Sequence, residues 1–140
     1  MRIRVVVYVA TALLASGTAL AAPASAPHAA DCVAALKANE GRLADTLKAG
    51  APVAGELLTV VRSGIAIIGT QYLAGLREAE ARRLLEAAEK DFQALPRPSA
   101  EARQAQCLQE GQALYRNASP IERGLITSAA RRRIRRLQSS

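Results

Sequence analysis

Apolar residues recur three and four positions apart through almost the whole chain from residue 31 onward, which is the spacing of one face of an α-helix. Segments that alternate apolar and polar residues, as half-buried strands do, are almost absent, and the 140 residues include only three tyrosines and one phenylalanine. The pattern therefore predicts an all-α fold that forms one small domain.

Glycine and proline divide this pattern into five helical segments. Gly50 and Pro52 separate the first two segments, Gly75 follows the second, and PRPS at 96–99 follows the third. SPIE, at 119–122, has the spacing of a capping box with proline at the first helical position, so it begins the last helix. We expect helices over about 32–48, 52–74, 77–95, 99–116 and 120–137, packed as successive antiparallel hairpins around the second.

The second segment contains GIAIIG, which is apolar almost all round and therefore predicts the most buried helix. Its glycines, Gly64 and Gly69, are expected to allow close contact with a neighbouring helix. A membrane-spanning helix is the alternative. Glu56 and Arg62 interrupt the apolar run, however, and the uncharged part over 63–76 is far shorter than a span requires. We expect no transmembrane segment in the mature chain.

The first residues resemble a secretory signal in their order of features. Arg2 and Arg4 give a basic start, an apolar run covers 5–15, and small residues end in Ala19-Leu20-Ala21. Residues 1–21 are therefore interpreted as a cleaved signal peptide, which predicts a periplasmic or secreted protein.

Residues 22–30, APASAPHAA, are rich in alanine and proline and are interpreted as a flexible leader before a helical domain at 31–140. Asp31 is then expected to cap the first helix. The leader contains His28, the only histidine of the chain, which we interpret as a solvated residue and not as a metal ligand.

Two cysteines in an exported chain of this size predict a disulfide between Cys32 and Cys107, since small exported domains gain stability from such bonds. An intermolecular bond or two buried free thiols are the alternatives. An intramolecular bridge would stabilise the fold by about 4 to 5 kcal/mol in the chain-entropy model.

Groups that could perform catalysis are few. The expected folded part has no histidine, its cysteines are expected to be oxidised, and it has no phosphate-binding loop, nucleophile elbow or dinucleotide-binding fingerprint. We therefore expect no enzyme activity, no catalytic residues, no cofactor and no metal site.

Five arginines occur in six residues near the C-terminus. The sequence has 19 basic and 12 acidic residues; Arg2 and Arg4 belong to the expected signal and five more to this run, so the rest of the chain has 12 of each sign. The basic character thus resides in one helix end, which is expected to remain amphipathic. The arginines are Arg131, Arg132, Arg133, Arg135 and Arg136.

Such a run predicts an anionic partner. Nucleic acid is not expected as the partner of an exported chain with so few aromatic residues. The sequence favours a non-catalytic interaction protein of the bacterial envelope, of the binding, chaperone-like or toxin-neutralising class, whose arginines contact another envelope protein. A peripheral binder of an anionic membrane or lipopolysaccharide surface is the alternative, and an enzyme is the third candidate. The arginines would also be explained, without a partner, by a solvated helix end.

Cleavage of the expected signal is directly measurable. The mature protein should begin near Ala22, because Ala19 and Ala21 present the small side chains that a signal peptidase accepts. Intact-mass spectrometry of protein purified from an envelope fraction checks this. A mass that includes Met1 to Ala21 would contradict cleavage.

Overall fold

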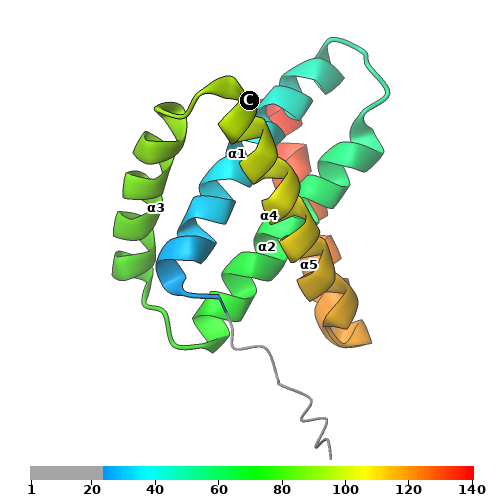
Figure 1. Ribbon diagram of the computed structural model, residues 1–140. Coiled ribbons are helices and arrows are strands. Elements are labelled where there is room, and N and C mark those ends of the chain that lie inside the picture. The colour runs from blue at the N-terminus through cyan, green and yellow to red at the C-terminus, as the bar shows by residue number, and fades with distance from the viewer. Residues whose placement is uncertain (1–23) are drawn as a thin grey trace, which may run out of the picture.

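The computed structural model describes residues 24–140, so the expected signal peptide at 1–21 and the first two residues after it lie outside the described part (Figure 1). The described residues form five helices and no strand, which confirms the predicted all-α fold. The helices are α1 (Ala26–Lys48), α2 (Ala54–Leu73), α3 (Glu78–Gln93), α4 (Arg97–Asn117) and α5 (Pro120–Ser139).

Helix α1 begins earlier than the sequence interpretation placed it. Ser25 has an extended backbone and its side chain accepts a hydrogen bond from the His28 backbone N–H, so Ser25, and not Asp31, is the N-cap. Pro27 lies in the first turn, where its missing N–H breaks no intrahelical hydrogen bond. The prediction of a flexible leader was therefore wrong for 26–30, which are helical, and Ala29 is buried.

Helix α2 begins at Ala54 and not at Pro52, and α4 begins at Arg97 and not at Ser99. Three other helix ends follow the predicted signals. Gly50 and Gly75 follow α1 and α2 with φ angles of +92° and +99°, values that favour glycine. At the start of α5, the Ser119 side chain accepts from the Glu122 N–H and the Glu122 carboxylate accepts from the Ser119 N–H. The hydrogen bond from the Ser119 backbone N–H to the carboxylate lowers the pKa of Glu122.

Helices α1 and α2 together form the centre of the molecule. Helix α3 packs mainly on α1, α4 packs on α2 and α1, and α5 packs mainly on α2. Figure 1 accordingly shows α3 beside α1, and α4 crossing in front of α1 and α2. Each outer helix thus has a central helix, and not the helix before it in the chain, as its main partner. The central position predicted for the second helix is shared with α1.

The core is formed mainly by aliphatic side chains of α1 and α2. Leu36 and Leu43 of α1 meet Leu57 and Val60 of α2, and all four are almost fully buried. Helix α2 is less buried near its C-terminal end, where Ile68, Tyr72 and Leu73 are exposed. No helix of residues 24–140 has the length and apolar character needed to cross a membrane.

The predicted disulfide joins α1 to α4. Cys32 and Cys107 have Cα atoms 5.1 Å apart, form the bridge, and are both buried in the core. The described residues contain no free cysteine. The bridge closes a separation of 75 residues, so it fixes α4 against a helix that is distant in sequence.

The close helix contact occurs at a different glycine from those expected. A Cβ added at Gly111 of α4 would lie 2.6 Å from the Cβ and 2.7 Å from the backbone oxygen of Ser63 in α2. A Cβ added at Gly64 or Gly69 would have no neighbouring atom within 4 Å. The expectation for Gly64 and Gly69 was therefore wrong, since α4 crosses α2 one residue before Gly64.

Replacement of Gly111 by alanine tests this crossing. Gly111→Ala should lower the free energy of unfolding by about 1 to 3 kcal/mol, because α4 must move away from Ser63. The matched control is Gly41→Ala in α1, an exposed helical glycine with open space around it, which should raise the free energy of unfolding by about 0.5 to 1 kcal/mol. Urea unfolding measures both. Equal stabilisation by the two substitutions would contradict the close approach.

Candidate functional site

The arginine run of α5 is divided by the helix into two groups. With 3.6 residues per turn, four of the arginines project within an arc of about 140°, and Arg133 points about 60° beyond the edge of that arc. The four are exposed, whereas Arg133 is partly buried. The exposed arginines are Arg131, Arg132, Arg135 and Arg136.

Arg133 has an intramolecular partner. Its Nε lies 2.8 and 2.9 Å from the two carboxylate oxygens of Glu40, and its Nη2 lies 2.8 Å from Glu40 Oε1. The Glu40 side chain is only 9% exposed. The pair attaches the C-terminal half of α5 to α1, so Arg133 stabilises the fold and is not free to bind another molecule.

The exposed arginines share their side of α5 with two apolar residues. Ile121 is 78% exposed and Leu125 is 66% exposed, and both fall within the same arc, one to four turns before the arginines. The opposite side of the helix is committed to the core, where Ala130 is fully buried and Ile134 packs. We call the outward set the α5 face. It consists of Ile121, Leu125, Arg131, Arg132, Arg135 and Arg136.

A hydrogen bond between side chains fixes the N-terminal half of α5 to α4. The hydroxyls of Tyr115 and Thr127 lie 2.9 Å apart. The Arg62 guanidinium of α2 lies 4.6 Å from the centre of the Tyr115 ring. The bond to Thr127, helped by the positive charge of Arg62, lowers the pKa of Tyr115. Both halves of α5 are thus held to other helices by polar contacts.

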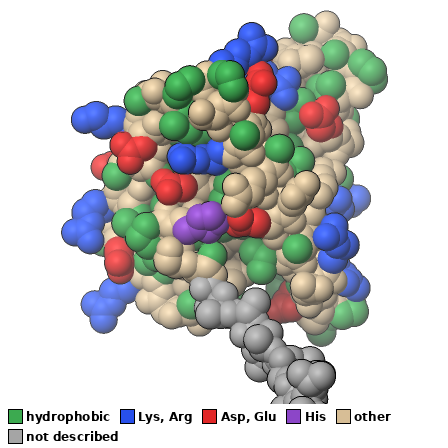
Figure 2. All heavy atoms as spheres, viewed as in Figure 1, with side chains coloured by type: hydrophobic (Ala, Val, Ile, Leu, Met, Phe, Trp, Pro, Cys, Tyr) green, Lys and Arg blue, Asp and Glu red, His purple; other side chains and the backbone are tan. Residues whose placement is uncertain are grey.

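His28 is part of the fold and not of a linker, contrary to the sequence interpretation. Its Nε2 lies 2.8 Å from Glu110 Oε2 of α4, and Figure 2 shows the histidine at the surface beside an acidic side chain. Cys32 Sγ lies 3.8 Å from His28 Nε2 and 3.6 Å from Glu110 Oε2. Three groups of ligand type therefore meet. Since the Cys32 sulfur is bonded to Cys107, it offers no thiolate to a metal ion.

The Arg133–Glu40 pair can be separated experimentally from the exposed arginines. Arg133→Gln should lower the free energy of unfolding by about 1 to 3 kcal/mol, because it leaves the Glu40 carboxylate buried without its partner. Arg132→Gln, one position away on the exposed face, should change it by less than about 0.5 kcal/mol.

Urea unfolding of both variants is the measurement, and a Glu40→Gln Arg133→Gln double variant should recover part of the loss. If Arg133→Gln and Arg132→Gln behave alike, Arg133 has no structural role.

Comparison of the chain with protein-family models, with curated proteins and with solved structures found no match. The function must therefore be inferred from the residues of the chain itself.

Proposed function

We propose that the chain is an exported, non-catalytic interaction protein of the bacterial envelope that binds an acidic partner protein through the α5 face. The observation that carries the proposal is the division of the arginine run. One arginine is used by the fold, and the other four are presented together on one exposed side of a helix whose two halves each have a polar contact with another helix.

The clustering of the four arginines has an energetic cost without a partner. Arg131 and Arg135, like Arg132 and Arg136, are four residues apart, and like charges at this spacing destabilise a helix by about 0.2 to 0.5 kcal/mol per pair. No ion pair is formed by these four side chains within residues 24–140. Carboxylates of a partner would remove this repulsion, and the arginine fork can bind a carboxylate through two hydrogen bonds.

The two exposed apolar residues of the α5 face, Ile121 and Leu125, could supply binding affinity that the charges alone do not. Charged groups at the rim of an interface mainly accelerate association and select the partner, while buried apolar anchors supply affinity. Ile121 and Leu125 lie on the same side of α5 as the arginines and are mostly exposed. A partner surface with an apolar patch beside acidic residues would complement the α5 face.

A membrane surface is the second candidate, because arginines near anionic lipid each contribute about 1 kcal/mol of attraction. A helix that lies in a membrane interface, however, uses a continuous apolar face opposite its charges. In α5 that apolar side packs on α2 and includes the buried Ala130. Only Ile121 and Leu125 would be available to the lipid, so a protein partner is favoured.

A peptide probe tests the α5 face. A synthetic peptide with four glutamates and two leucines should bind the wild-type protein, and more weakly as salt rises. Replacing Arg131, Arg132, Arg135 and Arg136 with glutamine should weaken binding by at least about tenfold, mainly through slower association, while Arg133 and the fold are retained. Biosensor kinetics at low and physiological salt measure both effects.

The control replaces four exposed arginines outside α5 with glutamine and so gives the same net charge. These are Arg77, Arg83, Arg97 and Arg116. Equal weakening by both sets would mean that only net charge matters. Strong wild-type binding to anionic phospholipid vesicles at physiological salt, lost only in the α5 variant, would replace the protein partner by a membrane. Unchanged peptide and vesicle binding in the α5 variant would mean that the arginines are a solvated helix end.

A further inference from the structure

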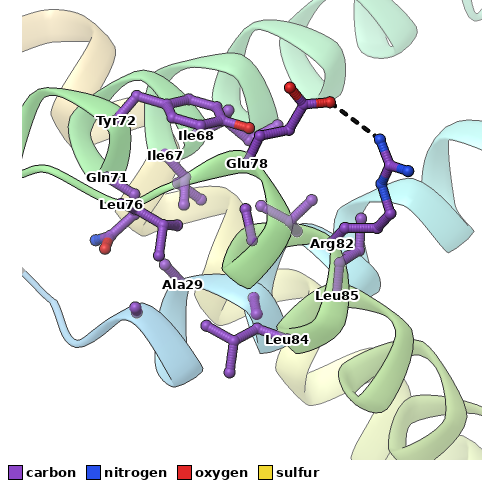
Figure 3. A pocket seen from close by; sticks show the side chains of 14 residues that line it. Ala29, Ile67, Ile68, Gln71, Tyr72, Leu76, Glu78, Arg82, Leu84 and Leu85 are labelled. Carbon is purple, nitrogen blue, oxygen red and sulfur yellow. Dashed lines mark hydrogen bonds and ion pairs between the residues drawn. The ribbon is translucent and has the colours of Figure 1, made fainter.

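An apolar cavity of about 260 Å³ lies between α1, α2 and α3 (Figure 3). Ile67 and Ile68 of α2 line one side and Leu84 and Leu85 of α3 line the other. The amide of Gln71, which also lines the cavity, donates a hydrogen bond to the carbonyl of Ala24. Figure 3 shows the Glu78–Arg82 ion pair at the edge. The Gln71 amide and the Glu78–Arg82 pair are thus satisfied within the protein, and most of the remaining lining is apolar.

The cavity exists because α2 and α3 are not packed on each other. Both helices pack on α1, which forms the bottom of the cavity between them. This bottom is made of small side chains, Ala26, Ala29 and Ala30, which do not fill the space. Tyr72 stands beside the opening and is 46% exposed.

A second cavity, of about 360 Å³, adjoins the first. Val33, Ile68 and Leu85 line both cavities, so the two are neighbours. We call the two cavities together the groove, whose lining residues come from α1, α2, α3 and α5. The second cavity also has an apolar floor, but it ends at basic residues of α1 and α5. These are Lys37, Arg133 and Arg136, and the acidic Glu40 lines the same cavity.

The basic end of the groove has an unneutralised positive charge. Lys37 is paired with Glu89 of α3, and Arg133 is paired with Glu40. Arg136 forms no ion pair within residues 24–140. The groove therefore has the apolar cavity between α1, α2 and α3 at one end and the guanidinium of Arg136, unpaired within residues 24–140, at the other.

We propose that this groove binds a single-chain anionic amphiphile, with the alkyl chain in the cavity between α1, α2 and α3 and the acidic headgroup at Arg136. Each methylene group that leaves water strengthens binding by up to about fourfold. Ligand pockets in proteins have volumes of about 300 to 1,000 Å³. The second cavity lies within this range and the first lies just below it, so the groove has room for a small ligand such as one alkyl chain. The proposal uses different residues from the α5 face, except for Arg136, and does not depend on a protein partner.

Alkyl phosphates below their micelle-forming concentration are suitable probes. By isothermal titration calorimetry, dodecyl phosphate should bind the purified protein with a stoichiometry of one. Octyl phosphate, which has four fewer methylenes, should bind about 15- to 250-fold more weakly at two- to fourfold per methylene. Dodecyltrimethylammonium should bind at least about tenfold more weakly than dodecyl phosphate, because Arg136 repels its headgroup.

Two pairs of variants locate the site. Ala81→Phe, in α3, fills the first cavity and should weaken dodecyl phosphate binding at least about tenfold, whereas Ala87→Phe on the exposed side of α3 should not change it. Arg136→Gln should weaken binding about threefold to fivefold and leave that of the uncharged dodecyl maltoside unchanged. Arg132→Gln, which is outside the groove, should have no effect.

Circular dichroism of each variant verifies that it is folded, and the surface substitution Arg136→Gln provides a test even if Ala81→Phe does not fold. The proposal is overturned if dodecyl phosphate does not bind. It is also overturned if the cationic detergent binds equally well, or if Ala81→Phe is folded and binds like Ala87→Phe. If the wild-type protein binds dodecyl phosphate but not the acidic peptide, the proposed amphiphile site is retained and only the proposed protein partner is contradicted.

Discussion

The arrangement of the five helices depends on one turn of α4. Within that turn Cys107 is bonded to Cys32 of α1, Glu110 contacts His28 of α1, and Gly111 touches α2. A covalent bond, a polar contact and a backbone approach thus fix α4 across both central helices. Helix α4 covers part of both α1 and α2. Helix α3 packs on α1 and α5 packs mainly on α2, so α2 and α3 do not pack closely on each other. The groove between them follows from this arrangement.

The inner and outer sides of helix α5 use the arginine run differently. The inner side must pack on the core and satisfy the nearly buried Glu40, which Arg133 does. The outer side has no such constraint and carries four exposed arginines that form no ion pair within residues 24–140. Fold stability alone accounts for one arginine, and the helix dipole favours basic residues only in the last turn. The remaining charge is the reason to infer a partner.

Local signals in the sequence were enough to predict the number of helices, the ends at Gly50 and Gly75 and the capping box at Ser119, because each depends on residues a few positions apart. The start of α1 was missed because APASAPHAA was read by composition, although its Ser25 is an N-cap with proline two residues later. The contact of Gly111 and the separate role of Arg133 were not predictable, since each depends on a residue far away in the chain, Ser63 or Glu40. The groove is likewise a product of tertiary packing.

The two proposed sites meet at Arg136. It lies at the edge of the exposed arc of α5, about 60° from Arg133, and it also lines the basic end of the groove. An acidic headgroup bound there would neutralise one of the four charges that a protein partner would contact. Binding free energies are coupled reciprocally, so a partner that engages Arg136 would weaken amphiphile binding by the same factor by which the amphiphile weakens partner binding. The shared arginine thus makes the two proposed ligands competitors even though most of their contacts are separate.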